Sequence, residues 1–293
     1  MVGYKIHNQI SAVILNWRDP ENTLACVGSL GELAQLNQIV IVHNERHHSP
    51  FPQGTFSSML TPVLELFIPE NRGFSAGINT GIRHALLTNC DAVLLINNDA
   101  VLGENALEKL LSELNFPNVG MVAPIILNPD ETLQASGASV KSNSLSVNEQ
   151  SIQNFDFLTF ACVLIKSSTF EEIGLLDEAF FMYWEDVDFG LRVKAAGLEL
   201  VVVPEATAIH AVSSSRKIAG SRVDLYSAFG LGAFGIKHPQ YKFGSYFRIT
   251  LRVLKRIALL QFCFAYKLWR AFKDGQKLDR PSYLKVTKEN WPL

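Results

Sequence analysis

DAVLLINND, residues 91–99, is the stretch that says most about the fold of this 293-residue chain. Its apolar run predicts a strand buried on both faces, as the strands of a parallel sheet are. Asn97, Asn98 and Asp99 follow the run directly. A carboxylate just after a buried strand can bind a hard divalent cation such as Mg²⁺ or Mn²⁺. Asn and Asp are also frequent in turns, so the tripeptide alone leaves a simple turn open.

Similar apolar runs on both sides of this stretch alternate with segments of helical character. The predicted strands cover residues 10–15, 38–42, 63–68, 91–96, 157–165 and 198–203. The predicted helices cover residues 19–33, 167–174 and 185–196, and another starts in 71–77 and ends near residue 88. This alternation predicts βαβ units, and therefore an α/β fold with a mostly parallel sheet flanked by helices. Residues 136–151, rich in Ser and Asn, are expected to form a surface loop.

Polar residues follow the carboxyl ends of several predicted strands: Asn16, His43, Asn71 and Asn97. Ligands of open α/β sheets bind in the crevice at those ends, so we expect the site there. The segment GFSAG, residues 73–77, places small residues at a helix start, where backbone N–H groups could face a phosphate. It is not the GxGxxG pattern of dinucleotide-binding folds.

Composition limits the class of protein. About 48% of the residues are apolar, enough for one large core or two fused lobes. No run reaches the roughly 18 apolar residues that a membrane span needs. The polar first residues do not resemble a secretory signal, and the four scattered cysteines form no CxxC pair. A cytoplasmic protein without a disulfide framework is therefore expected.

The charges are divided unevenly along the chain. Residues 1–215 carry 10 Lys and Arg against 24 Asp and Glu, whereas residues 216–293 carry 16 against 4. Cationic and apolar positions interleave with helical spacing over residues 243–272, which predicts a basic, amphipathic C-terminal region. Such a region suits an anionic membrane surface, and an ordinary helical lobe or a homodimer interface is the alternative. Nucleic acid is not expected, because no recognition motif is present and the acidic body would repel it.

Two further groups of residues could carry chemistry. Glu185 and Asp186 follow an aromatic run, FFMYW at residues 180–184. Carboxyl groups packed beside aromatic rings can have raised pKa values suited to a general base, but acidic residues are also common at helix starts. His210 follows the last predicted strand. A lone histidine there is more often structural than a ligand, although imidazole can bind Mn²⁺ beside a partner such as Asp99.

Taken together, four segments resemble glycosyltransferase family 2, whose members have the GT-A fold. They are NRGFSAGINTGI (residues 71–82), LLINNDAVL (94–102), GLLDEAFFMYWEDVDFGLRVKAAG (174–197) and VVVPEATAIH (201–210). The resemblance covers roughly residues 10–215 and is greatest for the bacterial rhamnosyltransferase-like branch, which builds surface polysaccharides. It implies a GT-A domain over residues 1–215, divided into a nucleotide-sugar half (1–115) and an acceptor half (116–215), followed by the basic region 216–293.

The resemblance also implies an activity and its residues. The chain would be a metal-dependent, inverting glycosyltransferase of the hexosyltransferase type, which moves a sugar such as rhamnose from a nucleotide diphosphate to a hydroxyl. Asp99 and His210 would hold Mn²⁺ or Mg²⁺, and Asp186 would be the general base, in preference to Asp188. Glu185 and Trp184 would shape the acceptor side. The residues implied for donor binding are Asn16, His43, Arg72, Gly73, Asn79 and Asn97. A saccharide or lipid-linked saccharide would be the acceptor, and the protein would lie peripherally on the inner face of the cell membrane.

Two departures from the family pattern leave an alternative open. His43 ends the second strand where the family has an aspartate that recognises the base or ribose, and Phe160 stands where the family has a glycine. The first change would suit a nucleotide-sugar-binding protein without catalysis. A nucleotidyltransferase is less well supported, because the loop after the first strand, residues 16–20, contains no glycine to cradle a triphosphate.

Overall fold

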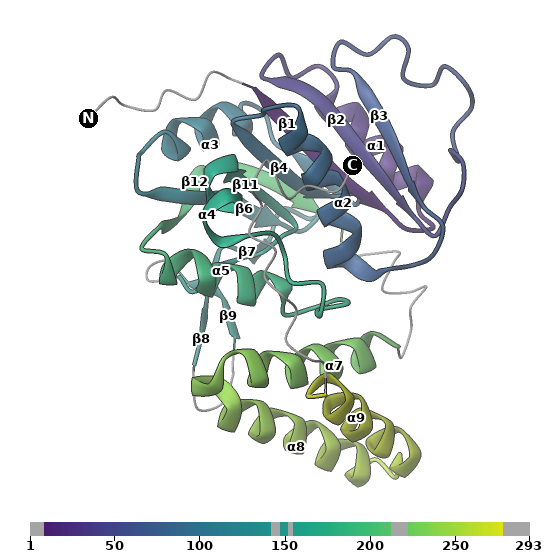
Figure 1. Cartoon of the computed structure of the whole chain (residues 1–293), viewed down its shortest axis with the longest axis vertical. Coiled ribbons are helices and arrows are strands. Elements are labelled where there is room, and N and C mark those ends of the chain that lie inside the picture. The colour runs from purple at the N-terminus through teal and green to yellow at the C-terminus, as the bar shows by residue number, and fades with distance from the viewer. Residues whose placement is uncertain (1–8, 142–146, 152–154, 212–221, 278–293) are drawn as a thin grey trace.

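A computed structural model of the chain describes residues 9–141, 147–151, 155–211 and 222–277 (Figure 1). One half of its main sheet is parallel, with the strand order β3-β2-β1-β4. These strands are β1 (Ile10–Asn16), β2 (Leu36–Asn44), β3 (Val63–Ile68) and β4 (Ala92–Asn97). The apolar runs of β1, β2 and β4 are buried on both faces, as the sequence indicates for DAVLLI, whereas the edge strand β3 is mostly half-buried.

The other half of the sheet contains antiparallel neighbours. Its strands are β5 (Ala100–Leu102), β6 (Val119–Leu127), β7 (Leu133–Ala135), β11 (Cys162–Lys166) and β12 (Glu199–His210). β11 lies antiparallel between β4 and β6, while β12 runs parallel to β6 and antiparallel to β5. The expected α/β fold is present, but the sheet is mixed, because β11 is not entered through the crossover helix that a parallel neighbour needs.

Helices cover both faces of the sheet. α1 (Pro20–Leu30) and α3 (Ala106–Leu114) bury apolar side chains on one face, and α2 (Gly73–Leu87), α4 (Ser167–Ile173) and α5 (Glu185–Ala195) do so on the other. Alternate strand residues divide between the two cores: Ile39 and Ile41 face the first, and Val40 and Val42 the second. This period of two is the reason a single strand serves both layers.

Residues 136–151 differ from the expected loop. β8 (Gly137–Val140) pairs with β9 (Val147–Ser151) and with β10 (Phe157–Leu158) in a small antiparallel sheet. Its Ser and Asn content concealed a strand whose Ala138 and Val140 are buried. The strand expected at 157–165 is divided into β10 and β11, and the residues between them line the cavity described below.

The basic C-terminal region forms a helical lobe below the sheet (Figure 1). It comprises α7 (Arg222–Lys237), the short η1 (Pro239–Tyr241), α8 (Lys242–Ala258) and α9 (Phe262–Gly275). α7 and α9 cross at two glycines: a Cβ on Gly232 would lie 2.1 Å from the carbonyl oxygen of Phe272, and one on Gly275 would lie 2.0 Å from that of Phe229. The helical pattern over 243–272 is thus two helices with a corner between them.

The lobe packs on the α/β domain through an aromatic cluster. Phe234 and Phe272 of the lobe share this core with Phe180 and Trp184, and the Trp184 and Phe234 rings are 5.0 Å apart. The boundary predicted near residue 215 falls among residues 212–221, outside the described part of the chain. No described helix combines the length and the apolar character needed to cross a lipid bilayer.

Candidate functional site

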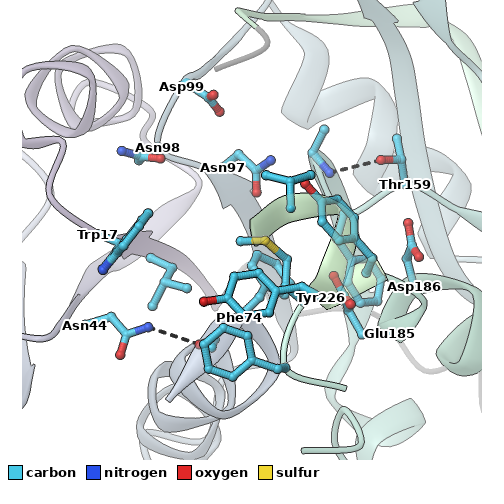
Figure 2. Close-up of a pocket in the computed structure, with 18 of the residues that line it drawn as sticks. Trp17, Asn44, Phe74, Asn97, Asn98, Asp99, Thr159, Glu185, Asp186 and Tyr226 are labelled. Atoms are coloured by element: carbon cyan, nitrogen blue, oxygen red, sulfur yellow. Dashed lines mark hydrogen bonds between the residues drawn. The ribbon is translucent and has the colours of Figure 1, made fainter. Parts of the chain in front are cut away.

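A cavity of about 470 Å³ opens where β1, β2 and β4 end (Figure 2). Leu15, Trp17 and Asn44 line it from β1 and β2, and residues 97–99 line it from β4. Residues 181–183 ahead of α5, and Glu185 and Asp186 at its start, close it from the opposite side. The carboxyl ends of neighbouring parallel strands meet at one edge of a sheet. The cavity therefore lies where the polar residues at the strand ends predicted a ligand site.

Asn44 holds the loop on one side of the cavity. Its amide nitrogen donates to Asn71 Oδ1 and to the Gly73 carbonyl, each at 3.1 Å, and its oxygen accepts from the Arg72 backbone N–H at 3.0 Å. Gly73 has φ +82°, and a Cβ there would lie 2.2 Å from the Phe181 carbonyl oxygen. Only glycine fits that backbone and that approach, which fastens the start of α2 to the loop that precedes α5.

Asp99 and His210 meet at the edge of the cavity, with Asp99 Oδ1 3.1 Å from His210 Nε2. The tautomer of His210 follows from Gln134. The Gln134 amide nitrogen donates to the His210 carbonyl at 3.0 Å, so its oxygen faces the ring and accepts from Nδ1 at 2.6 Å. In the neutral ring Nε2 then has a lone pair, toward which Asn97 donates at 3.3 Å. Two acceptors, a carboxylate and an imidazole nitrogen, thus face each other.

A divalent cation fits between these two acceptors. Two ligands about 2.1 Å from an octahedral ion, at right angles to each other, lie about 3.0 Å apart, close to the separation found. Carboxylate oxygen and neutral imidazole both suit Mn²⁺, and Gln134 supplies the outer hydrogen bond that ligating histidines usually have. No group of three or more His, Cys, Asp or Glu gathers among the described residues, so the remaining ligands would come from water and from the substrate.

The acidic pair at the start of α5 faces the cavity from the other wall (Figure 2). Tyr183 and Trp184 have φ values of +73° and +77°, and this bend directs Glu185 and Asp186 into the cavity. Glu185 is 8% exposed and its Oε2 has no hydrogen-bond partner among the described residues. Burial, and then the charges of Asp186 and Asp188, raise the pKa of Glu185 well above its ordinary value. Asp186 is only half-buried.

Asp188 is fully buried and lies outside the cavity lining. It accepts from Arg192 Nε at 2.8 Å and pairs with His238 Nε2 at 2.8 Å. Burial alone would raise the pKa of Asp188, but the charges and hydrogen bonds of Arg192 and His238 outweigh it and lower the pKa. Asp188 therefore ties α5 to the helical lobe and is not available to a substrate.

Six of the residues predicted for the site line the cavity: Gly73, Asn97, Asp99, Glu185, Asp186 and His210. His43 does not, and the expected contact with a donor needs correction. Its side chain is fully buried, its ring nitrogens are bonded to Asn16 at 2.9 Å and Glu65 at 2.8 Å, and it stacks on Phe67. Both polar atoms are occupied, so it has none left for a base or ribose. Asn16, which is 1% exposed, belongs to the same network.

Three more predicted residues do not line the cavity but support the segments around it. Asn79 donates to the Leu176 carbonyl at 2.8 Å, and Arg72 contacts Glu178 at 3.3 Å, so both hold the segment before α5. Trp184 turns away from the acceptor side. Its indole N–H donates to the Ser227 carbonyl at 3.2 Å and its ring enters the aromatic cluster of the lobe.

Other lining residues were missed by the sequence argument. Trp17 and Asn44 directly follow or end predicted strands, so their positions did carry a signal. Thr159 lies in the break between β10 and β11 and lines the same cavity as Asp186 (Figure 2). Tyr226 comes from α7 and packs on Phe181 with ring centroids 4.6 Å apart. Nothing local in the sequence around residue 226 points to a cavity.

Comparison with known proteins gives a family match. The model of the family described as "Glycosyltransferase like family 2" matches residues 7–223. A hexosyltransferase of low-salt glycan biosynthesis, Agl10 of Haloferax volcanii, is 30% identical over 48% of this chain and 49% of its own length. The dTDP-rhamnosyl transferase RfbF of Shigella flexneri is 22% identical over 76% of each chain. An N-acetylglucosaminyl-diphospho-decaprenol L-rhamnosyltransferase of Mycobacterium tuberculosis is 29% identical over 41% of this chain and 47% of its own. The matches to the Haloferax and Mycobacterium proteins thus span about half of their lengths.

Two solved structures share the fold. GalNAc-T7, crystallised with UDP, GalNAc and Mn²⁺, superposes with a TM-score of 0.59 at 13% identity, over 82% of this chain and 54% of its own. The mannosyltransferase PcManGT of Pyrobaculum calidifontis, in complex with GDP-Man and Mn²⁺, superposes with a TM-score of 0.52 at 14% identity, over 92% and 76%. The α/β architecture is therefore the GT-A fold.

Proposed function

Because this chain belongs to the family described as glycosyltransferase-like family 2, we propose that it moves a sugar from a nucleotide diphosphate donor to a hydroxyl acceptor in glycan synthesis. One observation carries the proposal. The cavity has a pair able to hold a metal, Asp99 and His210, on one side and an acidic pair, Glu185 and Asp186, on the other. These are the two functions that metal-assisted transfer to a hydroxyl requires.

On the donor side, Asp99 and His210 would hold Mn²⁺ or Mg²⁺ against the diphosphate. The ion would offset the charge that develops on the leaving diphosphate. Asn97 donates toward His210 and Gln134 fixes its ring, so the pair is oriented before any donor arrives. Trp17 and Asn44 line the adjoining wall and are placed to contact the nucleoside.

On the acceptor side, Asp186 would take the proton from the attacking hydroxyl. Its half-exposed carboxyl suits this role, whereas the raised pKa of Glu185 favours a protonated group that donates a hydrogen bond. The base and the leaving group then lie on opposite sides of the anomeric carbon. A hydroxyl that attacks in line from the Asp186 side would invert that carbon, with no covalent intermediate on the protein.

We propose a deoxyhexose such as rhamnose as the transferred sugar, by analogy with the relatives from Shigella and Mycobacterium. The decaprenol-linked acceptor named for the Mycobacterium relative suggests a saccharide or lipid-linked saccharide here. Such an acceptor would suit surface polysaccharide synthesis by a protein peripheral to the inner face of the cell membrane.

The second candidate is a nucleotide-sugar-binding protein without catalysis. It is favoured by His43, which stands in place of the family's aspartate and is turned away from the cavity. The acidic pair argues for the enzyme, because Glu185 turns into the cavity a buried carboxyl whose Oε2 has no partner among the described residues.

A panel of UDP-, dTDP- and GDP-sugars separates these candidates. Thermal shift with and without Mn²⁺ should show stabilisation by one nucleotide, dependent on the metal and lost in Asp99→Asn. Donor hydrolysis or transfer that EDTA abolishes would then support the enzyme. Metal-dependent binding with no turnover, unchanged by Asp186→Asn, would support the binding protein, and no binding of any donor would contradict both.

A further inference from the structure

The outer surface of the helical lobe is apolar where it faces solvent. We call it the α8–α9 surface. Its exposed large apolar residues are Phe243, Phe247, Leu251, Leu254 and Ile257 on α8, Leu259 and Leu260 at the corner, and Phe262, Tyr266 and Trp269 on α9. The α8 residues are three or four positions apart, which places them on one face of the helix. Scattered single apolar residues are normal on a surface, but a contiguous group marks a contact site.

α8 has apolar residues on two sides, and only one of these sides faces solvent. On the inner side Ile249 is fully buried in the core of the lobe. Arg252 and Arg256 point inward, where both contact Asp224 of α7 at 3.3 and 2.6 Å. The phenylalanines and leucines point outward, and Phe243 is 73% exposed. The buried Ile249 and the contacts of both arginines with Asp224 hold the same side of α8 inward, which leaves the phenylalanines and leucines outside.

The corner between the helices is the most exposed part of this surface. Leu260 is 78% exposed and has φ +57°, a conformation that a leucine adopts only at a cost. Phe262, at the start of α9, is 60% exposed. A polar residue or glycine would be the ordinary choice for such a corner in water, so the leucine indicates that the corner meets an apolar phase.

The charges around the α8–α9 surface indicate which apolar phase it contacts. Residues 222–277 contain eleven Lys and Arg and two Asp, and Lys255, Lys267 and Arg270 are exposed beside the apolar residues. Apolar side chains flanked by cations match an anionic lipid surface, where the former enter the interface and the latter meet the headgroups. A symmetric dimer through the same patch would bring these cations against their own copies, which disfavours a second copy of this chain.

We propose that the α8–α9 surface docks on an anionic lipid bilayer, with the corner at Leu260 and Phe262 inserted into the interface. The proposal deepens the proposed function and rests on it for the lipid-linked acceptor. α7 packs on α8 and α9 and also reaches the cavity through Val223 and Tyr226. Docking would therefore hold the acceptor side of the cavity in a set position relative to the membrane.

Cys263 allows a direct test on the full chain. It is exposed beside the corner, whereas Cys26, Cys90 and Cys162 are buried, so an environment-sensitive fluorophore should label this site alone. We expect a blue shift on addition of phosphatidylcholine vesicles containing 40% phosphatidylglycerol, and a much smaller shift with pure phosphatidylcholine. Co-flotation of unlabelled protein with the same vesicles should follow the same order and weaken in high salt.

Two sets of variants sharpen the test. Leu260→Asp and Phe262→Ser remove the inserted corner, and Lys267→Glu with Arg270→Glu removes cations; each should weaken vesicle binding about tenfold or more. Leu60→Asp is the matched control, because Leu60 is 72% exposed on the α/β domain. Its binding should match that of the unaltered protein. All these residues are on the surface, so thermal melts should show each variant folded.

The outcomes separate this proposal from the proposed function. No binding to either vesicle, while a nucleotide sugar still stabilises the protein, would overturn membrane docking alone. Equal binding to both vesicles would overturn the anionic partner. Self-association without lipid that Leu260→Asp abolishes would replace the membrane with a second copy of the chain. Vesicle binding without any donor binding would support docking and contradict the glycosyltransferase.

Discussion

Replacing Glu185 with glutamine probes the acidic pair without any substrate. The wild-type carboxyl is buried, and its Oε2 has no partner in the described part of the chain. Its pKa is raised first by burial and then by Asp186 and Asp188. The folded protein therefore keeps a proton on Glu185 at pH values where the unfolded chain has released it. The free energy of unfolding must then fall as the pH rises from the ordinary glutamate pKa toward the folded one. Glutamine has the same shape and no proton to lose, so the variant should lack this component of the pH dependence.

The size of the effect follows from one proton. Across that interval the wild type should lose up to about 1.4 kcal/mol per pH unit relative to Glu185→Gln. At about 2–4 °C per kcal/mol for a large domain, the two melting temperatures should diverge by about 3–6 °C per unit. The glutamine amide also lacks a partner at this position and adds an offset that does not change with pH. The slope is therefore the quantity to compare.

Thermal and urea unfolding of both proteins from pH 4.5 to pH 8 would measure that slope. Glu108→Gln, an exposed glutamate on α3, is the control and should leave the curve parallel to wild type. Asp186→Asn removes the neighbouring charge that helps to raise the Glu185 pKa, so the fall in stability should end at a lower pH. Parallel curves for wild type and Glu185→Gln would refute the assignment of a raised pKa, and with it a protonated Glu185 at the acceptor side.

Further expectations concern the base, the metal pair and the contact with the lobe. Asp186→Asn should lower the rate of sugar transfer about 10²–10⁴-fold, the usual contribution of a general base. Metal-dependent donor binding, measured by thermal shift, should be kept. Full transfer activity would exclude Asp186 as the base. Gln134→Leu should weaken Mn²⁺ binding to the free protein about 10–100-fold, because it removes the outer hydrogen bond to a ligating histidine. Calorimetry or Mn²⁺ spectroscopy would measure this loss, and Gln134→Glu should retain the affinity. His238→Ala removes one of the two partners that lower the pKa of Asp188. A carboxyl whose pKa is lowered by folding contributes stability above its unfolded pKa, and this stability is lost as the pH falls through the folded pKa. The variant should therefore lose less stability in acid than the wild type. Equal acid sensitivity would show that Arg192 alone lowers the pKa of Asp188.

Much of the fold followed from local pattern. The apolar runs that end at Asn16, Asn44 and Asn97 became neighbouring parallel strands, because side chains buried on both faces need a covered sheet. Asp99 and His210 were expected as partners from the resemblance to the family, and they lie 3.1 Å apart. A residue that directly follows a buried strand is carried to the same edge of the sheet whatever its neighbours are, so such positions are encoded locally.

Side-chain direction was decided by packing between distant segments. His43 lies near the end of a strand as predicted, but its side chain is buried, because it hydrogen-bonds to Asn16 and Glu65 and stacks on Phe67. Trp184 is next to the acidic pair, but its indole N–H donates to Ser227 of α7, 43 residues further along the chain. The sequence around residue 43 or residue 184 does not contain the distant residues that determine the direction of each ring.

The chain's composition and periodicity determined that its C-terminal region is basic, helical and amphipathic. Only the tertiary structure decided which face of α8 looks outward. Periodicity places the apolar residues on one side of a helix, and on composition alone that side would be the buried one. In the lobe, burial of Ile249 and the contacts of Arg252 and Arg256 with Asp224, more than 25 residues away, turn the other side inward. An ion pair between two helices fixes the rotation of each about its own axis, and that constraint exists only once both helices are in place.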